Sequence, residues 1–541
     1  MIFLCFALLS LVICVAHVLE GDNVADTSSR LHEDQSRSSR LLRAHVSARD
    51  LATGKTPYKP LCPKTPPSLS SLKFVCETLG ITDVEKCKKT KKFDKTTIGS
   101  IPSEIGLLTQ ATELSIVVES GAIPISISCL TKLKALSLSD AWLLNASSGF
   151  GGTIPSYLSR LTQLTSLNFD SKWLVGSIPT WFAMLTDLRA IRLYYTPTTT
   201  IPEVLFRLKH LESIDFAGDW MGTIPSKLAG LSALTYLDLS YLKLTGTIPS
   251  ELSSLTALTF LTFSNNELTG TIPTTFESMT ALKALELGWN KLTGTIPSKF
   301  SSMANLTRLG LAKNQLSGEM PSTFSSMTAM RSLDLSFNIL RGKLPSMISS
   351  MIHLEVLDVS HNRITGSLPS TFAKLTALAK LDLSFNELIG ASPSISSMRA
   401  LTWLSLSDNK LKSVPTTIGT MTGLNHLYLS NNDLEGNMPS AIFALTALQE
   451  LALSNNHLHG TLPSALSKLT AMASLDLRNN TFTGGIPPEL LVPAIFFLSL
   501  EGNNLEGSIL TCPTSWGVSF DCNDIFCSCC VSDEADVCYT V

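Results

Sequence analysis

The chain has 541 residues, a formal net charge of −3 and only 7% aromatic residues. A charge this close to neutral argues against nucleic acid or an acidic membrane surface as the general partner. The length suits several ordinary domains or one long repeat array, and the dominance of Leu, Ser and Thr favours a single motif used many times.

The chain opens with an apolar run, MIFLCFALLSLVICVA, that is too short to span a bilayer. The small residue Ala16 closes this run and offers a cleavage point, so residues 1–16 are predicted to be a secretory signal peptide. No later stretch reaches the roughly 18 apolar residues that a transmembrane helix needs. We therefore expect a secreted, extracellular protein without a membrane anchor.

Residues 17–61 are polar, rich in Ser, Arg and Asp, and lack a periodic apolar face, which predicts a disordered leader. Within it, Arg40, Leu41, Leu42 and Arg43 spell Arg-x-Leu-Arg. A signal peptide followed by such a leader resembles the secreted RxLR effectors of oomycete plant pathogens. The resemblance implies a targeting motif and a virulence protein that suppresses plant immunity, with translocation into host cells. The same four residues would also suit a protease that cleaves at Arg-x-x-Arg, and a motif this short can arise by chance.

Twelve cysteines are present, and ten remain once Cys5 and Cys14 leave with the signal peptide. They gather towards the two ends of the remaining chain, and residues 130–511 contain none. Clustered, even-numbered cysteines in an exported chain indicate disulfides, although CNDIFCSCC would also suit a zinc site. Export favours oxidation, so we assign no metal ligand. The disulfide candidates are Cys62, Cys76, Cys87, Cys129, Cys512, Cys522, Cys527, Cys529, Cys530 and Cys538.

A proline recurs along the chain, and from Pro225 to Pro393 every step is 24 residues. A representative unit is LTALTFLTFSNNELTGTIPTTFESM, with the pattern L-x-x-L-x-L-x-x-N-x-L-x-G-x-I-P. The L-x-L alternation predicts a short strand with its leucines inward, and the Asn can satisfy buried backbone groups of its own and the next coil. Gly permits a turn, while Pro fixes φ and ends regular pairing. One coil cannot bury its own apolar face, so the coils must stack.

These units resemble the leucine-rich repeat family, and the Leu-Thr-Gly-x-Ile-Pro segment resembles its plant-type subclass. The match covers residues 98–510, in about 17–18 coils. The resemblance implies an α/β repeat solenoid, a curved horseshoe with a concave parallel β-sheet and disulfide-bonded caps. The cysteine clusters place the N-terminal cap at 62–97 and the Cys-rich C-terminal cap at 511–541.

The positions between the strand leucines predict the concave surface. One column is mostly acidic and reads Arg192, Asp215, Asp238, Thr262, Glu286, Gly310, Asp334, Asp358 and Asp382. It reflects either the repeat consensus LDLSFN or a binding face for a basic protein partner, and exposed aromatics beside it would favour binding. The predicted partner-binding residues are Trp142, Trp173, Tyr194, Tyr195, Asp215, Trp220, Asp238, Tyr241, Glu286 and Trp289.

The sequence offers no catalytic signature: G-x-S-x-G, H-E-x-x-H and the P-loop are all missing, and no cofactor is implied. The concave carboxylates could be read as a hydrolase pair, but they recur with the repeat, which accounts for them better. Three sequons, at Asn145, Asn305 and Asn479, predict a glycoprotein if the chain is exported.

Three non-enzymatic functions remain open. The leader favours a plant-pathogen effector that binds host protein and suppresses host defence. A capped solenoid without a kinase favours an extracellular binding or inhibitor protein, for example of wall-degrading enzymes. The Ser/Thr-rich coils and sequons would also suit a wall adhesion protein.

Overall fold

The computed structural model describes residues 69–141, 149–194, 200–391, 397–414, 416–490, 497–509, 518–521, 525–527, 530–532 and 537–540. The predicted signal peptide and the leader with Arg40–Arg43 lie outside the described residues. Several other residues singled out from the sequence also lie outside them, namely Cys62, Cys512, Cys522, Cys529, Trp142, Tyr195 and Asn145.

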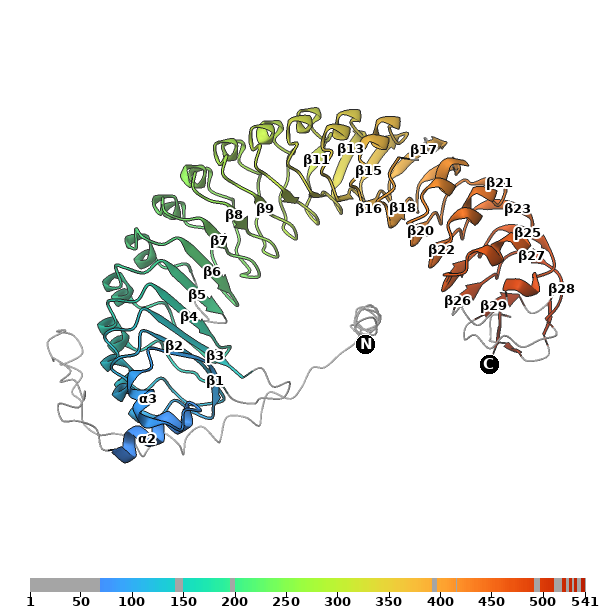
Figure 1. Ribbon diagram of the computed structural model, residues 1–541. Helices are drawn as coiled ribbons and strands as arrows, with labels where there is room; N and C mark the ends of the chain where they lie inside the picture. The colour runs from blue at the N-terminus through green and yellow to red at the C-terminus, as the bar shows by residue number, and fades with distance from the viewer. Residues whose placement is uncertain are drawn as a thin grey trace, which may run out of the picture. The chain divides into compact units, whose positions relative to one another are not determined.

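Most coils contribute one short strand to a parallel sheet on the concave side of the stacked repeats (Figure 1). The register places equivalent residues side by side, as with Leu237, Leu261 and Leu285, and these leucines are fully buried. Since side chains alternate along a strand, the residues between the leucines face outward. The repeat strands of this sheet are β1 (Lys92–Ile98), β2 (Glu113–Val118), β3 (Ala135–Asp140), β4 (Ser166–Asp170), β5 (Ala190–Tyr194), β6 (Ser213–Ala217), β7 (Tyr236–Asp238), β8 (Phe260–Thr262), β9 (Ala284–Glu286), β10 (Arg308–Gly310), β12 (Ser332–Asp334), β14 (Val356–Asp358), β16 (Lys380–Asp382), β18 (Trp403–Ser405), β20 (His426–Tyr428), β22 (Glu450–Ala452), β24 (Ser474–Asp476) and β26 (Phe497–Ser499).

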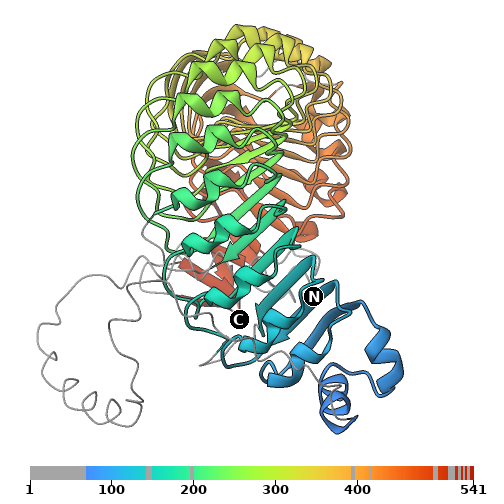
Figure 2. The same ribbon diagram turned by 90° about the vertical axis from the view of Figure 1, so that its left-hand side faces the viewer.

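Short 3₁₀ turns follow the Ile-Pro pairs and line the convex side (Figures 1 and 2). A proline directly precedes most of them with φ near its fixed value, for example −62° at Pro297, while the preceding Ile296 is buried. The turns are η2 (Ser103–Leu107), η3 (Ile125–Cys129), η4 (Ser156–Arg160), η5 (Thr180–Met184), η6 (Glu203–Arg207), η7 (Ser226–Gly230), η8 (Ser250–Ser254), η9 (Thr274–Ser278), η10 (Ser298–Ser302), η11 (Ser322–Ser326), η12 (Ser346–Ser350), η13 (Ser370–Lys374), η14 (Thr416–Thr420), η15 (Ser440–Ala444), η16 (Ser464–Lys468) and η17 (Pro488–Leu490).

A second set of short parallel strands forms where the chain passes from the concave sheet towards the 3₁₀ turns. These strands form a five-stranded, a four-stranded and a two-stranded sheet, and they appear mainly in the second half of the array. They are β11 (Ser317–Gly318), β13 (Ile339–Lys343), β15 (Arg363–Gly366), β17 (Glu387–Ala391), β19 (Lys410–Ser413), β21 (Glu435–Asn437), β23 (His457–Thr461), β25 (Thr481–Gly484), β27 (Asn504–Leu505), β28 (Gly507–Ile509) and β30 (Ile525–Cys527).

The asparagines form a ladder of hydrogen bonds between coils, as expected, although each reaches the preceding coil rather than the next one. Asn338 donates from Nδ2 to the carbonyl oxygens of Leu311 in the preceding coil and Leu335 in its own coil, at 3.0 and 3.1 Å. Its Oδ1 accepts a hydrogen bond of 2.9 Å from the backbone N–H of Leu316. Each asparagine therefore satisfies buried backbone groups of two coils, which helps to hold the stack together.

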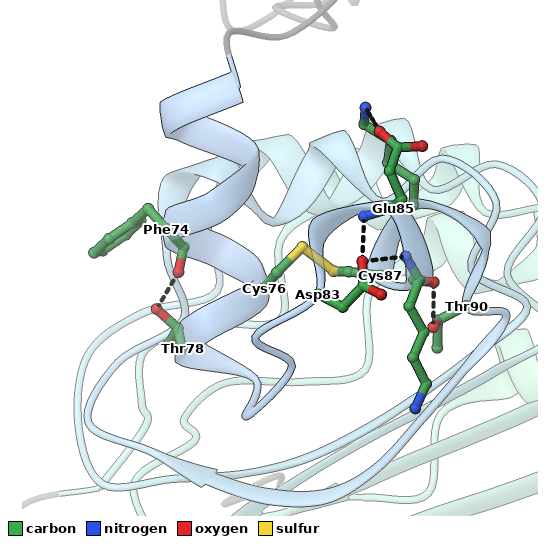
Figure 3. The surroundings of a disulfide bond; sticks show 9 residues. Phe74, Cys76, Thr78, Asp83, Glu85, Cys87 and Thr90 are labelled. Atoms are coloured by element: carbon green, nitrogen blue, oxygen red, sulfur yellow. Dashed lines mark hydrogen bonds and ion pairs between the residues drawn. A yellow bond between two sulfur atoms is a disulfide. The ribbon is translucent and has the colours of Figure 1, made fainter.

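The N-terminal end is covered by α2 (Leu69–Thr78) and α3 (Val84–Lys89). A disulfide between Cys76 and Cys87 joins the two helices (Figure 3). The side chain of Asp83 caps α3 by accepting hydrogen bonds from the backbone of its first turn. Cys129 is also disulfide-bonded, so the predicted disulfide-bonded cap is present in part.

The C-terminal end closes differently. β29 (Val518–Asp521) continues the parallel sheet from β26 and then pairs antiparallel with β32 (Val537–Thr540). β31 (Cys530–Ser532) pairs with β32 in turn. The last repeat strand is thereby covered by the end of the chain, as a repeat array requires.

Candidate functional site

The first group of functional candidates, the N-terminal cluster, comprises Arg192, Tyr194, Asp215, Tyr236, Asp238 and Phe260 on β5–β8. The guanidinium of Arg192 lies 4.3 Å from the centre of the Tyr194 ring and 3.3 Å from the Asp215 carboxylate. The Tyr194 hydroxyl also donates to Asp215, at 3.2 Å. Two coils later, Tyr236 stacks on Phe260 with ring centres 4.6 Å apart.

Burial governs the ionisation of this cluster. It raises the pKa of Asp215, with the nearby Asp238 adding to the effect. Burial and the charge of Asp238 together raise the pKa of Tyr236 to about 12. The Tyr236 hydroxyl donates a hydrogen bond to the Asp238 carboxylate at 3.4 Å.

A shallow hollow of about 450 Å³ adjoins this cluster, and its lining includes Asn168, Arg192, Asp215 and Tyr236 together with three serines. Asn168 donates from Nδ2 to the Ser137 hydroxyl at 2.9 Å. Its buried Oδ1 has no hydrogen-bond partner among the described residues. A buried acceptor without a partner costs stability, and because this atom is buried a ligand in the hollow would not reach it.

The second group, the carboxylate column, comprises Glu286, Asp334, Asp358 and Asp382, and it crosses β9 to β16 with Gly310 in the gap. In Asp334 one carboxylate oxygen accepts hydrogen bonds from the backbone and hydroxyl of Ser336, at 3.0 and 2.7 Å. Asp358 and Asp382 repeat this contact with the serine two residues on. In these three aspartates one oxygen thus belongs to the repeat, and the other oxygen is contacted by Lys380 in Asp358 but remains for a partner in Asp334 and Asp382.

Lysine and arginine neutralise part of the column. Lys380 lies 3.3 Å from Asp358, and Arg308 lies 4.0 Å from Glu286. In the described part of the chain no lysine or arginine is within ion-pair distance of Asp334 or Asp382. Burial raises the pKa of Glu286 and of Asp334, so a cation placed beside either would favour the ionised form.

The third group, the ring ladder, comprises Trp289, Lys313, Phe337, His361 and Phe385, one from each of five successive coils. The Lys313 ammonium lies 3.6 Å from the Trp289 ring centre and 4.7 Å from that of Phe337. His361 stacks between Phe337 and Phe385 at 3.9 and 4.0 Å. Trp289, Phe337 and Phe385 nevertheless remain 52, 41 and 46% exposed.

The backbone of the ring ladder argues for a role at the surface. All five residues have φ between 51 and 57°, the left-handed region that bulky side chains rarely adopt. The chain places asparagine, which tolerates this conformation, at equivalent positions such as Asn265, Asn431 and Asn455. Aromatic residues at 289, 337 and 385 are therefore not what the turn itself prefers.

A fourth group, the C-terminal cluster, does not follow from the sequence prediction and comprises Lys380, Trp403, His426, Tyr428 and Glu450. The Trp403 ring centre lies 4.7 Å from that of His426 and 5.0 Å from that of Tyr428. Tyr428 donates a short hydrogen bond to Glu450, and burial together with this contact raises the pKa of Tyr428. Lys380, Trp403, His426 and Glu450 each stand just before a strand leucine, and comparing that position across the coils is the sequence signal that marks them. Tyr428 follows its leucine and occupies the column position of Asp382.

Most predicted partner-binding residues in the described ranges lie on the concave side or at its edge. The structure brings Tyr194, Asp215 and Asp238 together in the N-terminal cluster and places Glu286 in the carboxylate column. Trp289 begins the ring ladder, and Tyr241 occupies the equivalent edge position two coils earlier, 65% exposed.

The assignment of Trp220 to the binding face is wrong. Its side chain is 0% exposed and stacks on Phe216, with ring centres 4.6 Å apart and planes inclined by 4°. Trp220 stands five residues before Pro225, as the buried Leu244 stands five before Pro249. It therefore fills a core position of its coil.

Trp173 is 38% exposed but follows the end of β4 and lies beside the glycine-rich segment of the preceding coil. Added Cβ atoms at Gly149 or Gly151 would collide with it, so these glycines leave room for the tryptophan. Trp173 is thus a surface residue outside the concave columns. The predicted contacts Trp142 and Tyr195 lie outside the described residues.

Two of the predicted glycosylation sites can be located. Asn305 is exposed in the turn before β10, where its Nδ2 donates to the Thr280 carbonyl at 2.9 Å. Asn479 is exposed at the edge of the concave sheet and donates to Asn455 Oδ1 at 2.7 Å. Both side chains are accessible, and their glycosylation stays a prediction.

Two further features concern metal binding and membrane spanning. Within the described ranges, no group of three or more His, Cys, Asp or Glu side chains is placed to hold a metal ion. None of the helices described is both long enough and apolar enough to cross a membrane.

Comparison with known families identifies the repeats. One family model described as leucine rich repeat matches residues 261–316, 282–340, 305–364 and 328–388. A second leucine-rich repeat model matches residues 233–255, 423–445, 447–469 and 472–491. The chain therefore carries leucine-rich repeats, as predicted. No curated protein sequence matches it.

Solved structures share the fold. The leucine-rich repeat ectodomain of the receptor kinase GASSHO1/SCHENGEN3 from Arabidopsis thaliana, in complex with CASPARIAN STRIP INTEGRITY FACTOR 2, is 30% identical, with a TM-score of 0.63. The match covers 76% of this chain and 52% of that one, so our chain spans about half the length of that ectodomain. The ectodomain of the Arabidopsis receptor kinase HAESA, in complex with an IDA peptide hormone, is 29% identical over 80% of this chain and 73% of that one, with a TM-score of 0.71.

A bacterial structure matches as well. A leucine-rich repeat protein of Leptospira interrogans is 25% identical over 75% of this chain and 98% of that one, with a TM-score of 0.61. The predicted solenoid with a long parallel sheet is thus confirmed. The same fold carries the bound ligands in the GASSHO1/SCHENGEN3 and HAESA ectodomains.

Proposed function

We propose that the protein is a non-enzymatic recognition protein that binds a protein or peptide ligand along the concave side of its repeats. The supporting observation is where its exposed aromatic residues lie. Apart from Phe74 in the cap and Trp173, those of the described ranges that are strongly exposed all lie on the concave sheet or its edge, namely Tyr241, Trp289, Phe337, Phe385 and Phe497. Exposed rings beside charged side chains are typical of binding hot spots.

The test is affinity capture with the whole chain as bait, followed by binding measurements on the captured ligand. Tyr236→Ser and Phe260→Ala introduce residues that the chain already uses in the same column, at Ser213 and Ala284, so the fold should tolerate them. We expect the double variant to bind the ligand about tenfold or more weakly, because aromatic side chains that become buried in the complex dominate the binding free energy of such interfaces. The control pair Glu203→Gln and Lys227→Gln removes an ion pair on the convex side. Equal weakening by both pairs would contradict a concave binding face.

We further propose that the ligand is a host protein and that the chain acts as a secreted effector. The leader supports this role, because Arg40–Arg43 resembles a targeting motif of plant pathogens. Replacing Arg40 and Arg43 by alanine should abolish entry into host cells while leaving export and ligand binding intact. Unchanged entry and unchanged suppression of host defence would remove the effector role and leave an extracellular binding or inhibitor protein.

A further inference from the structure

The carboxylate column and the ring ladder run side by side across the same coils. In each coil the ring-ladder residue comes three positions after the column position, as Phe337 follows Asp334. Backbone hydrogen bonds keep both features in register with the next coil. The N–H of Leu335 donates to the backbone carbonyl oxygen of Asp358, and the N–H of Phe337 donates to that of Ser360, at 2.8 and 2.9 Å. The two features therefore form a continuous surface.

Small, buried residues separate the two features. The position between them, here called the strip, is occupied by Gly288, Ala312, Ser336, Ser360 and Ser384. The three serines are 4–7% exposed, and their hydroxyls are held by the neighbouring aspartates. Nothing bulky on the strip would obstruct a chain that touches the carboxylates on one side and the rings on the other.

We infer that this surface binds an extended peptide segment in which basic and apolar side chains alternate, a step that rests on the proposed function. Adjacent strands lie about 4.8 Å apart, so the five coils span about 19 Å, which is roughly six residues of extended chain. Alternate side chains of such a segment point to opposite sides. One set would reach the carboxylates and the other would pack against the ring ladder.

Charge decides which side chains face the column. Asp334 and Asp382 lack an ion-pair partner in the described ranges, whereas Arg308 and Lys380 already pair with their neighbours. An acidic segment would be repelled here. The N-terminal cluster offers an internal precedent, because Arg192 there pairs with Asp215 while its guanidinium packs on Tyr194. The ligand would supply the missing cation at Asp334 and Asp382.

Contact with the ring ladder is apolar rather than cationic. The faces of Phe337 are covered by Lys313 and His361, and His361 covers one face of Phe385. The parts of Trp289, Phe337 and Phe385 that stay exposed suit aliphatic or aromatic side chains. Since Lys313 already lies between two rings, a second cation at that position would meet like charge.

The test uses the whole chain and three blocked octapeptides: alternating Arg and Val, alternating Glu and Val, and alternating Arg and Ser. We expect the Arg-Val peptide to bind most tightly and to weaken with added salt, because exposed charges are screened. The Glu-Val peptide should not bind, and the Arg-Ser peptide should bind about tenfold more weakly, since it lacks the apolar half. Equal binding of the Arg-Val and Glu-Val peptides would overturn the inference.

Two double variants locate the site. Asp334→Asn with Asp382→Asn keeps the oxygen that Ser336 and Ser384 contact and removes the charge, and should weaken the Arg-Val peptide about tenfold or more. Phe337→Asn with Phe385→Asn installs a residue suited to the left-handed backbone and should remove the preference for Val over Ser. Since the first pair creates Asn-Leu-Ser sequons, the protein should come from a host that does not glycosylate asparagine.

The matched control is Asp433→Asn, which removes a carboxylate away from the concave columns. If the control weakens binding as much as the column variant, the peptide binds by general charge attraction and the inference fails. Selection of peptides from a random library separates this failure from that of the proposed function. If the selected peptides are neutral or acidic and their binding is lost in the Tyr236→Ser, Phe260→Ala variant, the concave side binds peptides but the basic and apolar segment inferred here is wrong. A failure to enrich any peptide would count against both.

Discussion

The side-chain amide of Asn338 donates a hydrogen bond of 3.0 Å to the carbonyl oxygen of Leu311, one coil earlier. Replacing Asn338 by leucine would leave this carbonyl, that of Leu335 and the N–H of Leu316 without their side-chain partner. Each buried group left unsatisfied costs about 1–3 kcal/mol, so we expect a loss of about 3 kcal/mol or more in the local free energy of unfolding. Hydrogen exchange of the neighbouring coils measures this loss.

The matched control for that substitution is Asn431→Gly. Asn431 is exposed and has φ of 54°, a conformation that glycine adopts freely, and it is not part of the ladder. This change should alter stability by no more than about 0.5 kcal/mol. If both variants lose protection equally, the ladder does not hold the coils together.

The stack of Trp220 on Phe216 predicts a structural rather than a binding defect. Trp220→Ala would remove a fully buried ring, and we expect a loss of about 3–5 kcal/mol in stability. Trp220→Phe should cost clearly less, because the buried Nε1–H has no partner in the described residues and phenylalanine removes it. Thermal unfolding gives the order of the two variants. Ligand affinity measured on folded Trp220→Phe should equal that of the parent, and a loss would restore Trp220 as a contact residue.

The repeat architecture could be predicted because every coil carries the same constraints. The 24-residue period fixes where each inward leucine, asparagine and proline must lie, and the strands align in that register. The prediction for Trp220 fails because its coil is shorter than the next one. Pro225 follows Phe216 by nine positions, whereas in the next coil Pro249 follows Leu239 by ten. Counting forward from the strand therefore assigns Trp220 to the wrong position of the repeat. Counting back from Pro225 assigns it to the buried position that Leu244 occupies in the next coil.

The candidate site was predictable only in part, because contacts between side chains of different coils do not appear in a repeat pattern. The aromatic members Trp289, Phe337 and Phe385 stand out in the sequence at every second coil. Lys313 and His361 between them look like ordinary surface residues, and only the stacking distances identify them as members of one ladder. The aspartates are easy to find in the sequence, but their role is not. One oxygen of each carboxylate accepts a hydrogen bond from the serine two residues on, which is a structural role in the repeat, and the sequence does not show that the other oxygen of Asp334 and Asp382 stays without an ion-pair partner in the described residues.

The cap disulfide should stabilise its own end of the array. Replacing Cys76 and Cys87 by alanine removes a link between residues 11 positions apart, and such bridges typically contribute about 2–4 kcal/mol. Because each unit of a solenoid contacts mainly its neighbours, protection from hydrogen exchange should fall in α2, α3 and β1 but not in β14 or β16. Loss of protection along the whole array would show that the cap controls folding of every coil.

His361 should make the ring ladder sensitive to pH. Burial between Phe337 and Phe385 lowers its pKa, and Lys313 adds to the effect, while Asp358, Asp382 and Asp408 oppose it. An unfolded histidine titrates near pH 6.5, so the folded state binds this proton less readily than the unfolded state does. Stability from this residue is therefore present at neutral pH and falls as the pH drops below about 6.5.

His361→Asn removes the titrating group and keeps a side chain suited to the left-handed backbone at this position. We expect the parent to lose more thermal stability than this variant between about pH 7.5 and pH 5. His353→Asn is the control, because His353 is exposed and outside the ladder, and it should follow the parent curve. Parallel curves for the parent and His361→Asn would mean that stacking between two rings does not hinder protonation of His361.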